Sequence, residues 1–194
     1  MAIEQSAGGR PPLTDTETLR VQLLEILASR GYEHVTMGEL ADAANISVRT
    51  LHRYFPAKAD IAWGGIESSA DDFRDCLSEA SEMPDTISAV SFAVEAIFNR
   101  NVEGLDMMRS RLKLIALSPE LRRQRSHTFD GWRTALVEFI AQTKGTESSD
   151  LSTVALASSL HGAMLEGLSW WAQHAVERSP ADCVREALES LRGL

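Results

Sequence analysis

TMGELADAANISVRTLHRYFPAK, residues 36–58, predicts two short helices joined by a sharp turn. Thr36 and Glu39 have the spacing of a capping box, in which each side chain binds the other residue's backbone N–H at the start of a helix. Asn45 tolerates a left-handed backbone and can make the turn. Ser47 is a preferred N-cap for a second helix. The stretch is therefore interpreted as a helix-turn-helix.

The second helix of this stretch has the composition of a DNA-binding surface. Its apolar residues Leu51 and Phe55 share one face, which leaves the polar and basic residues exposed. No Asp or Glu lies between Asp42 and Asp60, so the surface is locally basic although the chain has a net charge of −9. The number of phosphates neutralised locally governs DNA affinity. The predicted DNA-binding residues are Thr36, Ser47, Val48, Arg49, Thr50, His52, Arg53, Tyr54 and Lys58.

These residues divide between base contacts and phosphate contacts. The N-terminal part of such a helix approaches base edges in the major groove. There Arg49 can bind guanine through two hydrogen bonds, Val48 can pack on a thymine methyl, and Thr50 can bind a base or a phosphate. One head reads a short site, so two heads roughly 34–36 Å apart on an inverted repeat are expected. The expected phosphate contacts come from Thr36, His52, Tyr54 and Lys58.

The same residues resemble the TetR family of one-component transcriptional regulators. The resemblance covers residues 14 to 65 and rests on Thr50, Leu51, Tyr54, Phe55, Pro56 and Lys58, with Gly31, Tyr32, Val35 and Thr36 upstream. It implies a DNA-binding head, a helical body that dimerises, and a repressor released from DNA when a ligand shifts the fourth helix. The chain departs from the family at Asn45, where glycine is usual, and at His52, where tyrosine is usual. The second departure affects an expected phosphate contact.

A narrower resemblance extends into the rest of the chain. KADIAWGG after residue 57, MRSRLKLIAL followed by SPEL, and FDGWRTALVEFIA around Trp132 are similar to the regulators associated with mycofactocin gene clusters. This resemblance covers the segment between Trp63 and Ile140.

Length and composition favour an all-α, cytoplasmic protein. The chain has 194 residues, enough to bury a core, and few β-branched or aromatic runs of the kind that form strands. No apolar run approaches the roughly 18 residues of a membrane span, and the N-terminus lacks the pattern of a signal peptide. The two cysteines, Cys76 and Cys183, are expected to be reduced thiols. We expect a disordered tail over 1–13, a three-helix DNA-binding domain over 14–57, and a helical-bundle domain for ligand binding and dimerisation over 58–194.

Proline and glycine residues divide the body into helices. Pro84, Gly104, Pro119, Gly145 and Pro180 mark the breaks. Helices are expected at about residues 58–80, 86–100, 105–117, 119–143, 149–177 and 180–192.

A ligand pocket is expected between the middle helices. Six basic residues against one acid between positions 109 and 125 suit a phosphate or carboxylate. An apolar cavity with a basic mouth would suit a fatty acyl-CoA. The alternatives are that the charges are paired on exposed faces and that the apolar and polar residues are ordinary core. The predicted ligand-binding residues are Phe92, Phe98, Met108, Arg109, Arg111, Leu112, Ile115, Phe129, Trp132, His161 and Glu166.

The helix at 149–177 carries small residues at close spacing, which allow another helix to approach. Together with Val184, Leu188 and Leu191 of the last helix it resembles the four-helix dimer interface of the family. The alternative is an internal core helix of a monomer.

Two other classes of protein remain as alternatives. A helical-bundle enzyme would need a catalytic or nucleotide-binding motif, and G-x-S-x-G, H-E-x-x-H, Walker and Rossmann patterns are absent from the sequence. A non-DNA interaction protein would make the helix-turn-helix a coincidence. The sequence thus predicts a homodimeric regulator that binds double-stranded DNA and a hydrophobic effector, with no metal and no cofactor.

Overall fold

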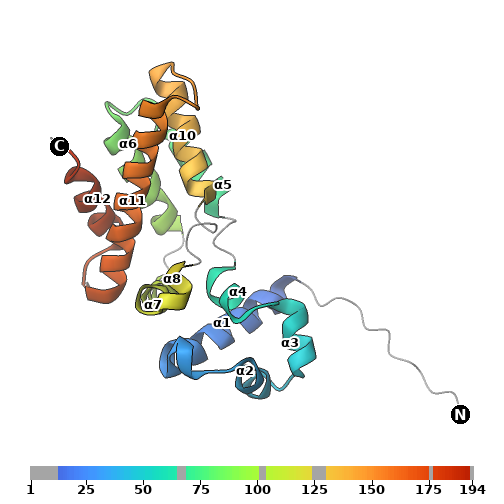
Figure 1. The fold of residues 1–194 in the computed structure, drawn as a ribbon. Helices are drawn as coiled ribbons and strands as arrows, with labels where there is room; N and C mark the ends of the chain where they lie inside the picture. The colour runs from blue at the N-terminus through green and yellow to red at the C-terminus, as the bar shows by residue number, and fades with distance from the viewer. Residues whose placement is uncertain (1–12, 65–68, 101–103, 124–129, 175–176, 193–194) are drawn as a thin grey trace, which may run out of the picture. The chain divides into compact units, whose positions relative to one another are not determined.

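The computed structural model describes residues 13–64, 69–100, 104–123, 130–174 and 177–192, and every regular element in these ranges is a helix (Figure 1). The all-α prediction is confirmed. The chain forms two compact units, residues 1–61 and 62–194. We call them the head and the body. The division falls inside a helix, four residues after the boundary expected at 57/58. None of the described helices is long and apolar enough to cross a membrane.

The head contains four α-helices and one short 3-10 helix. They are α1 (Leu13–Arg30), η1 (Tyr32–His34), α2 (Met37–Ala43), α3 (Val48–Tyr54) and the first turn of α4 (Lys58–Trp63). Leucines from the first three α-helices are buried in the head, as are Phe55 and Ile61. The core residues buried to within 2% exposure include Leu23, Leu24, Leu27, Leu40, Leu51, Phe55 and Ile61.

The turn between α2 and α3 forms as its residues predict. Asn45 has a φ of 54°, in the left-handed region that asparagine tolerates. The N–H of Ile46 donates to the carbonyl of Ala41 over 3.0 Å and closes the turn. Because α2 and α3 are only seven residues each, this turn and their caps determine how the two helices cross.

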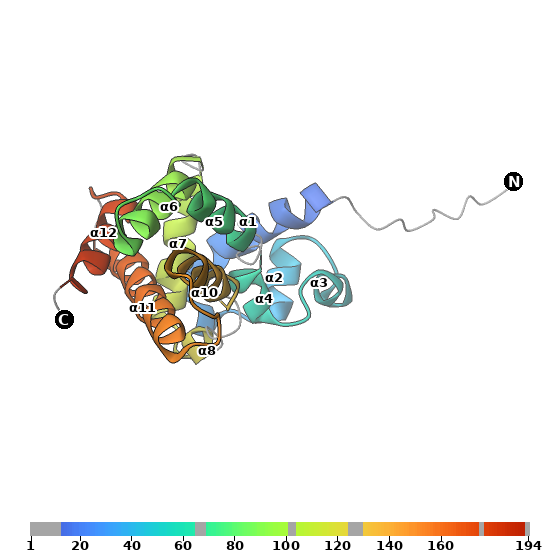
Figure 2. The same cartoon turned by 90° about the horizontal axis from the view of Figure 1, so that it is seen from above.

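The body is a bundle of seven described helices. They are α5 (Ser69–Glu79), α6 (Thr86–Arg100), α7 (Leu105–Leu117), α8 (Pro119–Arg123), α10 (Asp130–Lys144), α11 (Leu151–His174) and α12 (Pro180–Glu189). α11 packs against α7, α10 and α12, while α5 packs against α6 and α10 (Figures 1 and 2). Cys76 and Cys183 are buried free thiols, and burial raises the pKa of each.

Two expected helices differ from those of the structure. The helix expected over 58–80 is wrong as a single element, because α4 ends at Trp63, Gly64 is in a turn and α5 begins at Ser69. Gly64 carries the helix penalty of glycine, about 1 kcal/mol relative to alanine, at this break. The helix expected over 119–143 is described as α8 and α10, and residues 124–129 lie outside the described ranges. α6 and α7 have the predicted bounds.

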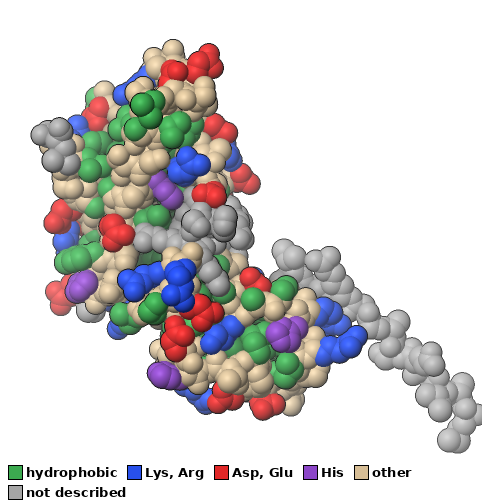
Figure 3. All heavy atoms as spheres, viewed as in Figure 1, with side chains coloured by type: hydrophobic (Ala, Val, Ile, Leu, Met, Phe, Trp, Pro, Cys, Tyr) green, Lys and Arg blue, Asp and Glu red, His purple; other side chains and the backbone are tan. Residues whose placement is uncertain are grey.

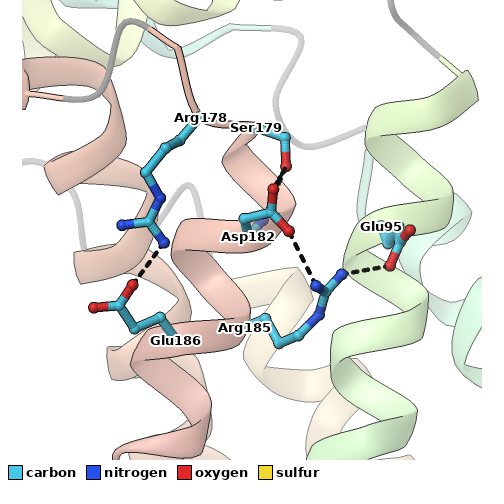
Figure 4. A network of polar contacts seen from close by, with 6 residues as sticks. All are labelled: Glu95, Arg178, Ser179, Asp182, Arg185 and Glu186. Carbon is cyan, nitrogen blue, oxygen red and sulfur yellow. Dashed lines mark hydrogen bonds and ion pairs between the residues drawn. The ribbon is translucent and has the colours of Figure 1, made fainter.

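A network of polar contacts around α12 includes one ion pair to α6 (Figure 4). Ser179 caps α12 by accepting from the N–H of Asp182. Arg185 donates to Asp182 over 3.0 Å and to Glu95 of α6 over 2.7 Å. Arg178, just before α12, pairs with Glu186 over 2.6 Å. These exposed pairs contribute little individually, typically about 0–1 kcal/mol each.

A second polar contact joins the start of α6 to the residues that follow α12. Asp85 caps α6 by accepting from the N–H of Ser88 over 3.0 Å. The same carboxylate accepts from Arg192, beyond the end of α12, over 2.9 Å. α12 is therefore held to α6 by polar contacts from its middle, through Arg185, and from Arg192, which follows it.

Candidate nucleic-acid interface and ligand cavity

The exposed face of α3 carries Val48, Arg49, His52 and Arg53. Val48 and His52 are four positions apart in the sequence, and so are Arg49 and Arg53. This spacing places all four residues on one side of the helix. The opposite side buries Leu51 and the following Phe55, both no more than 1% exposed. Figure 3 shows Lys and Arg side chains gathered over α3, with a His side chain beside them. The helix thus presents a basic surface that carries no carboxylate.

The N-terminal turn of α3 is held by two hydroxyl groups. The Ser47 hydroxyl accepts from the N–H of Thr50 over 3.1 Å, and the two hydroxyl oxygens lie 2.8 Å apart. Ser47 therefore acts as the predicted N-cap. Because the pair shares a single hydrogen bond, one of the two hydroxyls keeps its proton for a phosphate or a base.

The predicted capping box at the start of α2 is present. The Glu39 carboxylate accepts from the Thr36 N–H over 2.8 Å and from the Thr36 hydroxyl over 2.7 Å. These hydrogen bonds, the backbone one foremost, lower the pKa of Glu39. The Thr36 hydroxyl proton is therefore committed to a neighbouring carboxylate. A phosphate contact through that hydroxyl, as the sequence predicts, requires this bond to be exchanged.

Lys58 turns toward the interior of the head. Its ammonium donates to the carbonyl of Tyr32 over 2.7 Å and to that of Val35 over 3.0 Å. It also lies 4.1 Å from the centre of the Tyr32 ring. An ammonium has three N–H donors, and the two carbonyls engage two of them. A DNA phosphate would compete with these carbonyls for the ammonium. The phosphate contact of Lys58 therefore stays a prediction.

The last turn of α3 holds the other expected phosphate contacts. Nδ1 of His52 lies 3.0 Å from the carbonyl oxygen of Pro56. Tyr54 is half-buried beside Phe55, and the Arg53 guanidinium lies 5.3 Å from the centre of the Tyr54 ring. The ring therefore supports the arginine that α3 presents to solvent.

Arg20 of α1 positions this surface and was missed by the sequence analysis. Its guanidinium lies 5.0 Å from the centre of the Phe55 ring and donates to the carbonyl of Asp60 over 2.6 Å. It pairs with Glu17 over 2.9 Å, and its side chain is only 12% exposed. An arginine following Leu19, on the apolar side of an amphipathic helix, was the available signal.

The body contains a small cavity bounded by three helices. Its volume is about 30 Å³, enough for one or two water molecules. The lining residues come from α7, α8 and α11 and are Leu112, Ile115, Ala116, Arg122, Leu165, Leu168 and Ser169. Six of the seven line it with small or mainly apolar side chains, and Arg122 supplies the charge. Leu112 and Ile115 are thus the only predicted ligand-binding residues among those that line the cavity.

The other predicted ligand-binding residues are dispersed through the body. Trp132 belongs to the contact of α10 with α5, where its indole N–H donates to Ser69 over 2.8 Å and its ring stacks on Phe73 at 4.5 Å. Phe92, which is 37% exposed, and Glu166, which is also exposed, do not line this cavity, and their ligand contacts stay predictions. Phe98 and Met108 pack in the bundle core, His161 is half-buried on α11, and Phe129 lies outside the described residues.

One basic residue of α7, Arg109, contacts α11. The Arg109 guanidinium donates to the carbonyl of Ala172 over 3.4 Å and lies 5.9 Å from the centre of the Trp171 ring. Nε of Arg111 is buried. Of the expected basic cluster, Arg122 borders the cavity and Arg109 contacts the C-terminal part of α11, while Arg125 lies outside the described residues.

Some residues of the expected dimer face are buried within the body, and others are exposed. Val184 and Leu188 of α12 are fully buried in the core of their own body, which corrects their assignment to an interface. A Cβ on Gly167 would lie 2.8 Å from the Cα of Val184, so this glycine allows α12 to cross α11 closely. Gly162, in contrast, has open space above it. The residues of α11 that remain exposed are Leu151, Ser152, Ala155, Ser158, Ser159, Gly162, Glu166, Trp170 and His174.

Comparison with known families matches both parts of the chain. Residues 22–62 match the model described as bacterial regulatory proteins of the tetR family. Residues 84–193, more than half of the chain, match the model described as the MftR C-terminal domain.

Relatives and solved structures agree with these matches. A protein of Mycobacterium tuberculosis, provisionally named the mycofactocin biosynthesis transcriptional regulator MftR, is 25% identical over 86% of this chain and 84% of its own. The fatty acid degradation regulator FadR of Bacillus halodurans is 18% identical, with a TM-score of 0.66, over 95% of this chain and 97% of its own. FadR of Thermus thermophilus, solved with lauroyl-CoA, is 18% identical, with a TM-score of 0.55, over 90% and 91%. At these identities the two structures establish the fold.

Proposed function

The chain belongs to the TetR family of transcriptional regulators, with a C-terminal domain of the MftR type, and we propose that it is a homodimeric repressor released from DNA by a hydrophobic effector. The proposed operator is an inverted repeat in double-stranded DNA, and the proposed place of action is the cytoplasm. The named relatives are regulators, and we propose a regulatory rather than an enzymatic role.

The exposed face of α3 is the observation that carries this proposal. Arg49 is exposed near the N-terminus of the helix, where a bidentate contact to guanine is geometrically favoured. Val48 is 42% exposed although it is apolar, as a residue that packs on a thymine methyl should be. The proposed contact surface also includes residues that support the base contacts by binding phosphates. They are Ser47, Thr50, Arg53 and Tyr54.

A dimer is proposed through the exposed face of α11. Gly162 with open space above it would allow a second copy of this helix to approach closely. Trp170, 46% exposed and stacked on His174 at 5.3 Å, offers apolar area at one end of that face. Two heads held together would read two half-sites, which one short helix cannot do with comparable specificity.

The effector is proposed to enter between α7 and α11. The cavity there is lined by apolar groups and by Arg122, a combination that suits an acyl chain with an anionic head group. At about 30 Å³ it is far smaller than the roughly 300–1,000 Å³ of ligand pockets, so binding must separate the helices. Lauroyl-CoA in a FadR of the same fold makes an acyl-CoA the first effector to test.

The experiment is fluorescence anisotropy of the duplex directly upstream of the protein's own gene, at one fixed salt concentration. We expect the wild type to bind and Arg49→Ala to lose about 1–3 kcal/mol of binding free energy with relaxed base preference. Arg30→Ala, an exposed arginine of the head outside α3, is the matched control and should bind normally.

Adding lauroyl-CoA to the bound complex tests the effector. Release of the DNA supports an acyl-CoA effector, whereas retention discards that ligand class and leaves the DNA-binding proposal standing. If the folded wild type binds no upstream duplex at low salt, the proposed function is wrong.

A further inference from the structure

We propose that His52 contacts a DNA phosphate only as an imidazolium ion, so that each head takes up a proton when it binds its half-site. This rests on the proposed function, because it needs α3 to lie on DNA. The protein would then bind protons together with DNA.

The contact of His52 with Pro56 determines the state of one ring nitrogen. Nδ1 lies 3.0 Å from the carbonyl oxygen of Pro56, within hydrogen-bond distance. A carbonyl oxygen can only accept, so Nδ1 must carry the hydrogen. A neutral imidazole has a single N–H, and its other nitrogen, Nε2, then holds a lone pair.

Nε2 is the atom available to DNA. The two ring nitrogens point away from each other, so a ring that directs Nδ1 back to the backbone of its own helix end directs Nε2 outward. His52 is exposed and shares the face of α3 that carries Val48 and Arg49. A phosphate offers only acceptor oxygens, which a lone pair on Nε2 would repel. Protonation of Nε2 converts the same geometry into a charge-assisted hydrogen bond.

Tyrosine, usual at this position in the TetR family, would not need this step. Its phenol keeps its hydrogen across the neutral pH range and can donate to a phosphate at any pH between 6 and 8. Histidine therefore replaces a permanent donor by one that depends on pH. The replacement couples operator affinity to proton concentration.

The charged groups of the surrounding elements make most of their contacts elsewhere. On α3 itself, Arg53 lies over the Tyr54 ring, and Arg49 is one turn away. In α4, Lys58 binds the carbonyls of η1, and the Asp60 carboxylate accepts from the N–H of Ala57 over 2.7 Å. In α1, Arg20 pairs with Glu17. In α2, Glu39 is engaged in the capping box, and Asp42 is exposed. The proton is therefore assigned to His52 and the phosphate that it meets.

Two measurements test the proposal on the full-length protein and the upstream duplex. The first is the dissociation constant from pH 6 to pH 8 at constant ionic strength. For one linked proton per head, the affinity of a dimer should fall by up to about 100-fold per pH unit on the alkaline side. The second is calorimetry in phosphate and in Tris buffer, whose different ionisation enthalpies report the protons taken up.

The salt dependence gives an independent signature. Each phosphate contact made by a cation adds about 0.9 to the slope of log K against log salt. For the wild-type dimer the slope should therefore be steeper by about 1.8 at pH 6 than at pH 8.

Matched histidine variants decide the outcome. His52→Gln keeps a side-chain N–H donor but cannot titrate, so its affinity, proton uptake and salt slope should not change with pH. His34→Gln makes the same substitution at an exposed histidine of η1 and should behave as the wild type. If His52→Gln does not bind, His52→Tyr restores a permanent donor and takes its place.

Wild-type binding that is equal at pH 6 and pH 8, or pH dependence that persists in His52→Gln, overturns the proton-linked contact and leaves the regulator intact. A folded wild type that binds no DNA at either pH overturns the proposed function, and this proposal with it.

Discussion

Lys58 illustrates how a residue with the signature of a DNA contact can stabilise the head instead. Its ammonium joins the start of α4 to two carbonyls at η1 and lies against the Tyr32 ring. A similar division holds for Thr36, whose hydroxyl binds Glu39. At the level of single residues, α3 presents the contact surface, while polar groups around it maintain the shape of the head.

Lys58→Met should lower the free energy of unfolding of the head by about 2 kcal/mol, because two carbonyls lose a charged donor. If the ammonium stays on these carbonyls when DNA binds, the salt slope of DNA binding should not change, because no phosphate contact is then removed. Urea denaturation and anisotropy at several salt concentrations measure the two quantities. A slope reduced by about one per head, with little loss of stability, would instead assign Lys58 to a phosphate.

At the level of secondary-structure elements, the close crossing of α11 and α12 depends on one glycine, Gly167. A Cβ on Gly167 would meet the backbone of Val184 and Cys183 at 2.8 and 3.0 Å. Gly167→Ala should therefore destabilise the body by about 1–3 kcal/mol despite alanine's higher helix propensity. Thermal unfolding measures the effect. Ser158→Ala, at an exposed position of the same helix, is the control, and an equal effect in both variants would contradict the close crossing.

Asp85 gives the body a dependence on pH with a definite sign. The N–H of Ser88, foremost, and Arg192 hold the pKa of Asp85 below its ordinary value. A carboxyl group with a lowered folded-state pKa stabilises the protein above its unfolded pKa, about 4, and this contribution is lost as the pH falls below it.

Asp85→Ala should accordingly cost about 1 kcal/mol at pH 7 through loss of the cap on α6. The difference from the wild type should shrink as the pH falls from 5 to 3, as followed by denaturation at each pH. Asp75→Ala, which removes an exposed carboxylate from the middle of α5, is the control. A difference for Asp85→Ala that stays constant down to pH 3 would exclude the ionised cap as its source.

The sequence predicted the elements that depend on local signals. Thr36, Asn45 and Ser47 act through neighbours within four residues, and the proline and glycine breaks around α6 and α7 are equally local. The break at Gly64 was missed because the apolar period of Trp63 and Phe73 continues across it. The cavity was missed in large part because Leu165, Leu168 and Arg122 meet only when three helices pack, which periodicity along one helix cannot reveal.

At the scale of the whole molecule, assembly should depend on the open face of α11. Gly162→Arg places a charged side chain where the proposed partner approaches, so a mass of 21.3 kDa, that of one chain, should replace the dimer in light scattering. Binding to an inverted repeat should weaken at least tenfold, because two heads no longer bind together. Gln142→Arg, at an exposed position of α10, is the control. A dimer that persists in Gly162→Arg would place the interface elsewhere.

The small volume between α7 and α11 has a consequence for the concentration at which the protein responds. This cavity has room for one or two waters, so it would accept the proposed effector only in the minor population whose helices have separated. If that population is about 1%, the apparent dissociation constant is about 100-fold weaker than the intrinsic one. The response threshold is then set by how tightly α7 packs on α11 as much as by any contact with the ligand. Substitutions that loosen this packing would make the switch respond to a weaker signal without altering what it recognises.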